Sequence, residues 1–134
     1  AKKHPTAGAI AIGARKPLIA YNRNYDTPNI EIAANIAKTI RQSSGGYRFI
    51  KAGPVEIPER GITQVTMNLT DYTKTAMYRA FEAVKMEARR YGVNVMGSEI
   101  VGLCPMEALV DCASYYLGLE NFSLDKVLET SLME

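Results

Sequence analysis

Amide side chains occur at alternate positions in two stretches of this chain, and an amide can both donate and accept hydrogen bonds. Asn22 and Asn24 lie in the first stretch, and Gln64 and Asn68 lie in the second, with Thr66 between them. Such groups suit the edge of a heterocyclic ring or a carbonyl. A polar interface with another domain would use the same side chains, so both interpretations remain open at this point.

A second cluster, SSGGYRFIK at residues 43–51, combines a glycine loop with aromatic rings and two cations. Tyr47 or Phe49 could stack on a flat ring, and Arg48 and Lys51 could hold carboxylates. The alternative is an ordinary loop that leads into an edge strand, where the cations oppose aggregation. The sequence alone leaves both interpretations open.

Other residues that could do chemistry are scattered along the chain. Glu99 lies late in a strand-like stretch, where its carboxylate could orient an amine or a water, or simply face solvent. Residues 8–15 are spaced by glycines but lack the GK[ST] ending of a P-loop. His4 is the only histidine, and no Ser/His/Asp set can be built around it. Cys104 and Cys112 have no further ligands beside them, so no metal site is predicted.

Composition limits the class of protein. The 134 residues are 47% hydrophobic and 22% charged, which predicts one globular domain. A formal net charge of +2 without a basic stripe disfavours nucleic-acid binding. No apolar run is long enough to span a bilayer, and free thiols without a signal peptide predict a cytoplasmic protein. The first residue is Ala1, so we expect either a fragment or a processed piece.

The spacing of apolar residues predicts the elements that position these groups. Strands are predicted where polarity alternates or β-branched residues cluster, at residues 17–25, 47–57, 61–70 and 93–103. Helices are predicted from 3.6-residue spacing at residues 30–42, 73–91 and 105–118, with a short last helix from residue 123.

Local signals predict where several elements begin and bend. Thr27 is the predicted N-cap of the first helix, with Pro28 at its first position. Asp71 or Thr73 is predicted to cap the longest helix. Gly53-Pro54 predicts a bulge or kink in an edge strand.

The order of elements predicts an α+β fold, a ferredoxin-like βαββαβ sheet with helices on one face and one or two extra C-terminal helices. The first and third strands should be central. In the third strand Val65 and Met67 point to the helices, and Gln64 and Asn68 point to a bare face that needs water, a ligand or another domain. An RNA-recognition domain would carry aromatic residues there, which disfavours that function.

Five motifs in order carry a family resemblance: GAR at 13–15, NRN at 22–24, QVTMNLT at 64–70, GSEIVGL at 97–103 and PMEAL at 105–109. Together with SSGGYRFIKA at 43–52 they resemble the C-terminal subdomain of glutamate formimidoyltransferase (formiminotransferase), over about residues 4–119. The resemblance implies a linker or N-terminal arm at 1–16, the subdomain at 17–120 and a helical extension at 121–134. The open sheet face would pair with that of an N-terminal subdomain, in the same or a separate chain, with folate between them.

The resemblance also implies an activity, the transfer of a formimino group from N-formimino-L-glutamate to tetrahydrofolate in histidine degradation. The catalytic histidine of the family belongs to the N-terminal subdomain, so no catalytic residue is expected in this chain, and His4 does not match it. What carries over is folate contact, which the resemblance places at Ser43, Ser44, Gly45, Gly46, Tyr47, Arg48 and Lys51. Geometry adds possible contacts of the open face at Asn22, Asn24, Gln64, Asn68 and Glu99.

Other functions remain open on the sequence alone. The chain could be a stand-alone, non-catalytic folate-binding or assembly module that self-associates as a homodimer through the open face. It could also be a transferase of the same fold with a different one-carbon carrier. Whether the donor is a formimino or a formyl group is not fixed by these residues.

Overall fold

The computed structural model describes residues 17–132. The predicted arm at 1–16, with His4 and the glycine-spaced residues 8–15, lies outside the described residues. The elements in chain order are β1 (Ile19–Tyr25), α2 (Ile30–Ile40), β2 (Ile50–Ile57), β3 (Ile62–Leu69), α3 (Met77–Arg90), β4 (Val95–Val101), α4 (Met106–Leu117) and α5 (Leu128–Leu132). Short 3-10 turns occupy residues 42–44, 58–60 and 124–126. This order confirms the predicted one, with two C-terminal helices, but the short last helix begins at Leu128 and not at residue 123, where a 3-10 turn at 124–126 precedes it.

The four strands form one antiparallel sheet in the order β2-β3-β1-β4. The predicted central position of β1 and β3 is therefore confirmed, and so is the edge position of β2. The predicted bulge at Gly53-Pro54 is wrong, because the β2–β3 pairing runs without a register shift. An edge strand tolerates the proline, which lacks an N–H. The irregularity instead lies between β1 and β4, at Arg23 and Tyr25.

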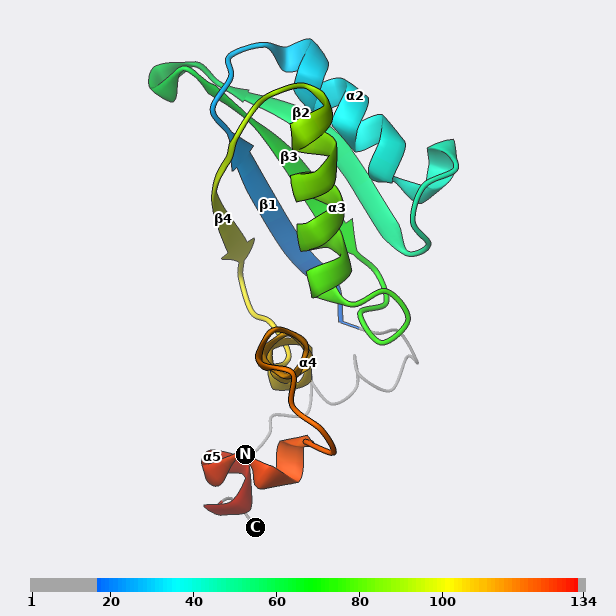
Figure 1. The fold of residues 1–134 in the computed structure, drawn as a ribbon, viewed down its shortest axis with the longest axis vertical. Coiled ribbons are helices and arrows are strands. Elements are labelled where there is room, and N and C mark those ends of the chain that lie inside the picture. Colours follow the sequence, from blue (N-terminus) through cyan, green and yellow to red (C-terminus); the bar gives the residue numbers. More distant parts are fainter. Residues whose placement is uncertain (1–16, 133–134) are drawn as a thin grey trace, which may run out of the picture.

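Helices α2 and α3 lie against the same face of the sheet (Figure 1). The alternation in β1 and β3 explains this arrangement, because every second side chain of a strand projects to the same side. Buried apolar side chains from both layers meet there: Ile19, Tyr21, Tyr25, Ala33, Ile36, Ala37, Ile40, Val65, Met67, Leu69, Met77, Ala80, Val84 and Ala88. The fold class predicted from the sequence is confirmed.

Two predicted caps differ from the structure. Asn29, not Thr27, caps α2, because its Oδ1 accepts a hydrogen bond from the Glu31 N–H at 3.0 Å. Helix α3 begins at Met77, later than predicted. Asp71 forms a local turn instead, in which its Oδ1 accepts from the Thr73 N–H at 3.0 Å. Aspartate favours such turns over continuing a helix.

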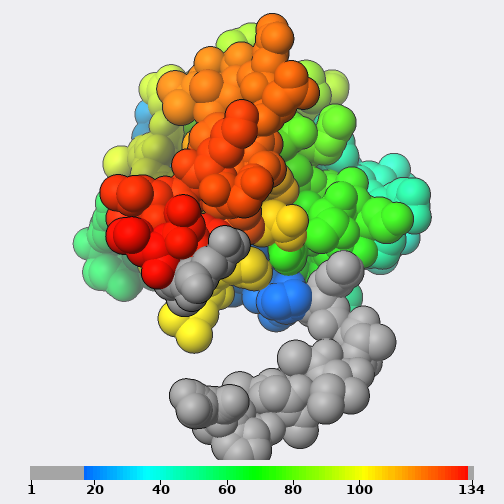
Figure 2. All heavy atoms as spheres, turned by 90° about the horizontal axis from the view of Figure 1, so that it is seen from below, coloured from blue at the N-terminus to red at the C-terminus, as the bar shows by residue number. Residues whose placement is uncertain are grey.

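Helix α4 and the segment after it, which includes α5, form one end of the elongated molecule (Figure 1), and α4 packs against α3 through aromatic rings. The Tyr78 and Tyr115 rings stack at 4.0 Å, and the Tyr116 hydroxyl donates to Glu82 Oε2 at 2.6 Å. Figure 2 shows α4 and the segment after it, in orange and red, spread over that end. The cysteines at 104 and 112 are both free. Within residues 17–132, no helix has the length and apolar character that crossing a membrane requires.

Candidate functional site

The open face is the side of the sheet opposite α2 and α3, and the strand register defines its rows. Residues paired across antiparallel strands project to the same side of a sheet. The first row is Lys51, Asn68, Ala20 and Val101, the second is Gly53, Thr66, Asn22 and Glu99, and the third is Val55, Gln64 and Asn24. The five predicted open-face residues and the predicted loop residue Lys51 therefore share one surface.

The second row is tied together by hydrogen bonds between side chains. The Thr66 hydroxyl donates to Asn22 Oδ1 at 2.8 Å, and Asn22 Nδ2 donates to Glu99 Oε1 in a long bond of 3.5 Å. In the third row, Gln64 Nε2 donates to Asn24 Oδ1 at 2.9 Å. These contacts explain why Asn22 and Gln64 are only 9% and 7% exposed on a face that α2 and α3 do not cover. Their neighbours within the sheet enclose them.

The same contacts leave part of the hydrogen-bonding capacity of the open face unused. Asn68 and Lys51 are exposed, and neither side chain makes a hydrogen bond to another of the described residues. Asn24 keeps its amide N–H groups, and Gln64 keeps its carbonyl oxygen. Donors and acceptors therefore alternate on this surface, with a cation at the β2 edge and the Glu99 carboxylate at the β4 edge. Three inter-strand spacings, about 14 Å, separate the edge strands β2 and β4 that carry these two charges.

The glycine loop after α2 is seated against the end of that helix. Gly45 has φ +93°, a left-handed conformation that glycine adopts without strain. Gly46 donates its N–H to the Arg41 carbonyl at 2.9 Å. A Cβ atom at Gly46 would lie 2.3 Å from the Ile40 carbonyl oxygen. Both glycines are thus required by the local backbone, one for its dihedral angle and one for its close approach.

A depression of about 560 Å³ lies between this loop and the start of β2. Its lining is formed by Arg41, Gln42, Ser43, Phe49, Ile50, Lys51, Ala52 and Thr70. Because Lys51 also belongs to the first row of the open face, the loop depression and the open face meet at this side chain. We refer to them together as the candidate site.

Phe49 gives the loop depression its shape and has a strained backbone. Its φ of +65° is uncommon for a residue with a side chain, and such strain concentrates at functional sites. Two contacts hold it. The Phe49 N–H donates to Gln42 Oε1 at 2.7 Å, and the Phe49 carbonyl accepts from the Thr70 N–H at 2.9 Å. The Arg48 guanidinium lies 4.9 Å from the centre of the Phe49 ring.

Of the seven predicted loop residues, only Ser43 and Lys51 line the loop depression. Tyr47 lines a different depression with Tyr78 and Tyr115, on the helix side of the sheet. Phe49, rather than Tyr47, is the aromatic ring beside Lys51. Gln42 and Thr70, which hold the Phe49 backbone, are not among the predicted site residues. The only sequence signal for this role is position, since Gln42 directly precedes the glycine loop and Thr70 directly follows β3.

The sequence of this chain matches known proteins over nearly its whole length. The family described as the formiminotransferase domain matches residues 20–132. A glutamate formimidoyltransferase of Streptococcus pyogenes serotype M1 is 55% identical over 133 residues, which are 98% of this chain and 44% of that protein. A glutamate formimidoyltransferase of Thermoplasma acidophilum is 49% identical over 126 residues, 94% of this chain and 42% of that protein.

A longer relative carries the same region. The formimidoyltransferase-cyclodeaminase of Dictyostelium discoideum is 39% identical over 139 residues, 98% of this chain and 26% of that protein. The chain therefore spans less than half the length of the curated relatives described here. The family match over residues 20–132 is decisive, and the chain belongs to the formiminotransferase domain family.

Proposed function

We propose that this chain is the folate-binding half of an enzyme that transfers a formimino group from N-formimino-L-glutamate to tetrahydrofolate. Two relatives that share about half of their matched residues with it are named glutamate formimidoyltransferase. The observation that carries the proposal is the junction at Lys51, where the loop depression and the open face become one surface. Residues 17–120 would form the subdomain, and residues 121–134 would extend it.

The charges of the candidate site suit an elongated ligand with carboxylates at one end and an amine-rich ring at the other. Arg48 and Lys51 would hold the glutamyl carboxylates of the folate, since cations form strong charge-assisted hydrogen bonds with them. The loop at residues 43–46 would close over the ligand. Gln64 and Asn24 would meet a heterocycle through their unused carbonyl and amide groups, and Glu99 would face the amine-rich end.

The reaction itself defines what this half must supply. A nitrogen of tetrahydrofolate attacks the formimino carbon, a tetrahedral centre forms, and the bond from that carbon to the glutamate nitrogen then breaks while a proton moves to the departing amine. Positioning the folate nitrogen is the part that falls to this chain, and orientation alone can supply a large share of a rate enhancement. Proton transfer would fall to the histidine of an N-terminal subdomain, which forms the other wall of the site.

A titration tests the proposal. Tetrahydrofolate or folinic acid is titrated calorimetrically into the chain, alone and with the N-terminal subdomain added. We expect binding that tightens with the partner and transferase activity only in the mixture. Lys51→Gln should weaken folate binding about tenfold, because it removes one charged hydrogen bond. Lys38→Gln, on the exposed side of α2, is the matched control. If the two variants bind folate with equal affinity, Lys51 is not part of the folate site.

The exposed amides of the open face favour a second candidate function, an assembly module that pairs this face with a copy of itself. Asn68 and Lys51, both exposed and without side-chain partners in residues 17–132, could be satisfied by such a pairing as well as by a ligand. Sedimentation velocity separates the two functions. A stable dimer that Asn68→Asp disrupts, with no folate binding in either form, would favour assembly over transfer.

A further inference from the structure

Arg23 is a buried cation without a carboxylate partner. It lies on β1, on the helix side of the sheet, and is 4% exposed. Its Nη1 donates to the Phe81 carbonyl at 3.0 Å, and its guanidinium carbon lies 4.0 Å above the Phe81 ring. Its Nε is buried and has no hydrogen-bond partner. Buried charges are normally paired, so this arrangement calls for an anion.

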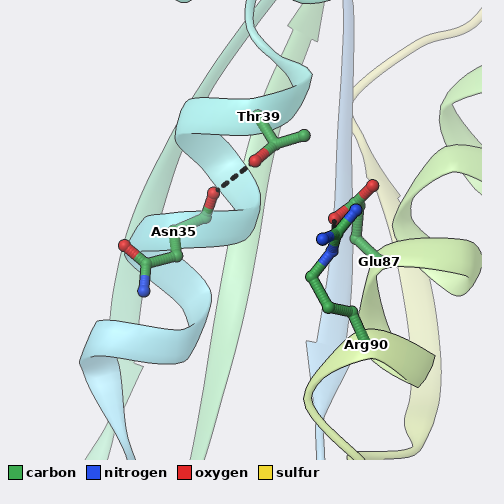
Figure 3. A network of polar contacts seen from close by, with 4 residues as sticks. All are labelled: Asn35, Thr39, Glu87 and Arg90. Carbon is green, nitrogen blue, oxygen red and sulfur yellow. Dashed lines mark hydrogen bonds and ion pairs between the residues drawn. The ribbon is translucent and has the colours of Figure 1, made fainter.

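No carboxylate in residues 17–132 fills that role. Glu87 is the one buried carboxylate among them, 7% exposed on α3. Figure 3 shows it beside Arg90, whose Nε lies 3.0 Å from Glu87 Oε1, and that contact is the only ion pair formed within the described part of the chain. The charge of Glu87 is therefore already matched by Arg90, and Arg23 is left without a counter-ion.

A cavity of about 510 Å³ opens beside Arg23, between α3 and β4. Lys85 and Arg89, one helical turn apart on α3, also line it, and both are exposed. Its lining thus includes three cations and no aspartate or glutamate. Its uncharged polar side chains are Asn94, whose amide already donates to Asp26 Oδ2 at 2.8 Å, and Ser98, so the three cations are the main recognition elements.

The irregular pairing of β1 and β4 lies at the same place. The register shifts between Arg23 and Tyr25, and such a shift bends a strand and redirects its side chains. Bulges of this kind are frequent beside binding sites. The buried cation, the acid-free lining and the bulge are independent observations that concern one cavity.

We propose that the cavity between α3 and β4 binds a small multiply charged oxyanion, a phosphate ester or a dicarboxylate, through Arg23, Lys85 and Arg89. Arginine holds either group through a planar pair of donors, and lysine adds a mobile charge at the rim. This site lies on the helix side of the sheet, away from the open face. It stands independently of the folate proposal and would bind a ligand or effector of its own.

The experiment uses the full chain with inorganic phosphate and glutarate as probes. Each is titrated at constant ionic strength set with chloride, while the melting temperature and the amide chemical shifts of residues 85–98 are recorded. We expect saturable shifts confined to those residues and a rise in melting temperature. The tighter probe identifies the ligand class, phosphate for an ester and glutarate for a dicarboxylate. Absence of a saturable response to both overturns the proposal.

Matched variants separate a built site from general charge effects. The double variant Lys85→Gln/Arg89→Gln should weaken probe affinity at least about tenfold, because each removed charge deletes a charge-assisted contact. Lys38→Gln/Lys74→Gln removes the same net charge from exposed positions outside the cavity and should leave the affinity unchanged. Equal losses in the two double variants overturn the proposal. Both pairs are exposed, so neither depends on the folding of an Arg23 variant.

A further control keeps this proposal distinct from the folate proposal. Lys51→Gln should leave phosphate and glutarate affinity unchanged, because Lys51 lies on the open face. If Lys51→Gln abolishes the probe response, the anion is bound at the loop depression and the assignment to the cavity is overturned. The affinity of the Lys85→Gln/Arg89→Gln variant for folate then tests the proposed folate site independently of the cavity.

Discussion

Replacing Gly46 with alanine should destabilise the protein and open the candidate site together. The added methyl group would meet the Ile40 carbonyl oxygen at 2.3 Å, the Thr39 carbonyl oxygen at 2.4 Å and the Ile40 carbonyl carbon at 2.5 Å. These atoms are backbone of the last turn of α2, which cannot rotate away as a side chain would. The loop must therefore move away from the helix.

The structure gives the size of this effect. The nearest contact is roughly 1 Å short of a normal van der Waals distance, and inserting a methyl group into a packed site costs about 1–3 kcal/mol. Moving the loop also weakens two hydrogen bonds, from the Gly46 N–H to Arg41 at 2.9 Å and from the Tyr47 N–H to Ile40 at 2.8 Å. Each contributes about 1 kcal/mol. We expect a total loss of about 2–4 kcal/mol in the free energy of unfolding.

Urea denaturation measures the loss, with two glycines as controls. Gly97→Ala meets no atom within 4 Å and has an ordinary φ, so it should be neutral or stabilise by about 0.5 kcal/mol. Gly45→Ala also meets nothing, but its φ of +93° should cost about 1 kcal/mol. The midpoint of Gly46→Ala should fall by about 1–2 M, given the usual urea dependence.

Folate binding is the second measurement, and it should weaken in Gly46→Ala more than in Gly45→Ala. The close approach at Gly46, not the mere presence of a glycine, fixes the loop depression. If the unfolding free energies of Gly46→Ala and Gly97→Ala agree within about 0.5 kcal/mol, the loop is not seated on α2 as described. The candidate site would then lose its geometric basis.

Two further predictions concern pH. The hydrogen bonds from the Asn94 backbone and side chain lower the pKa of Asp26, so their stabilisation is present above the usual carboxyl pKa and is lost as pH falls through the lowered value. Asp26→Asn should therefore reduce the loss of unfolding free energy between neutral pH and about pH 3. Burial, with the hydrogen bond to Glu107, raises the pKa of Tyr72 to about 12. The unfolded chain then loses its proton first, so stability should fall as pH rises above about 10 and level off near 12. Burial also raises the pKa of Tyr21, Tyr25 and Tyr116, so Tyr72→Phe should reduce this alkaline loss without abolishing it, as measured by denaturation across that range. A profile unchanged by either substitution would contradict the corresponding contact.

The open face could be predicted from the sequence because it rests on a period of two residues. Asn22 and Asn24, like Gln64 and Asn68, had to project to one side of their strands once the strands were assigned. The ferredoxin-like order then placed both strands at the centre of the sheet. Alternation does not fix the pairing register of β1 and β3, because shifting one strand by two residues leaves every side chain on the same face of the sheet. The contact between Asn22 and Thr66 could therefore not be predicted.

The loop after α2 resisted prediction because one residue breaks the alternation. Phe49 has φ +65°, and this left-handed step changes the direction in which the chain presents its side chains. Tyr47 consequently lies on the helix side, and Phe49 lies beside Lys51. Nothing in the sequence SSGGYRFIK marks the phenylalanine as the residue with this conformation. Glycine is the usual signal, and two glycines precede it.

The N-cap of α2 was predicted wrongly for a different reason, which is that neighbouring residues compete to form the turn before the helix. Thr27 and Asn29 flank Pro28, and either can cap a helix. The structure uses both in succession, because the Asn29 N–H donates to Thr27 Oγ1 at 3.2 Å before Asn29 caps α2. Alternation along β1 places Arg23 on the same face as Ile19 and Tyr21, both buried. The lack of a carboxylate beside it is a tertiary property that no local pattern reports.

The hydrogen bonds within the open face limit which of its residues can recognise a ligand. Asn22 uses its oxygen for Thr66 and directs its nitrogen to Glu99, so its amide is largely satisfied inside the sheet. In the proposed folate site it would act on the ligand only through Glu99, by orienting that carboxylate. The rows on either side differ, because Gln64 and Asn68 retain polar atoms without partners in the described chain. In the proposed folate site, recognition would therefore come from the two flanking rows, and the middle row would hold the Glu99 carboxylate in place between them.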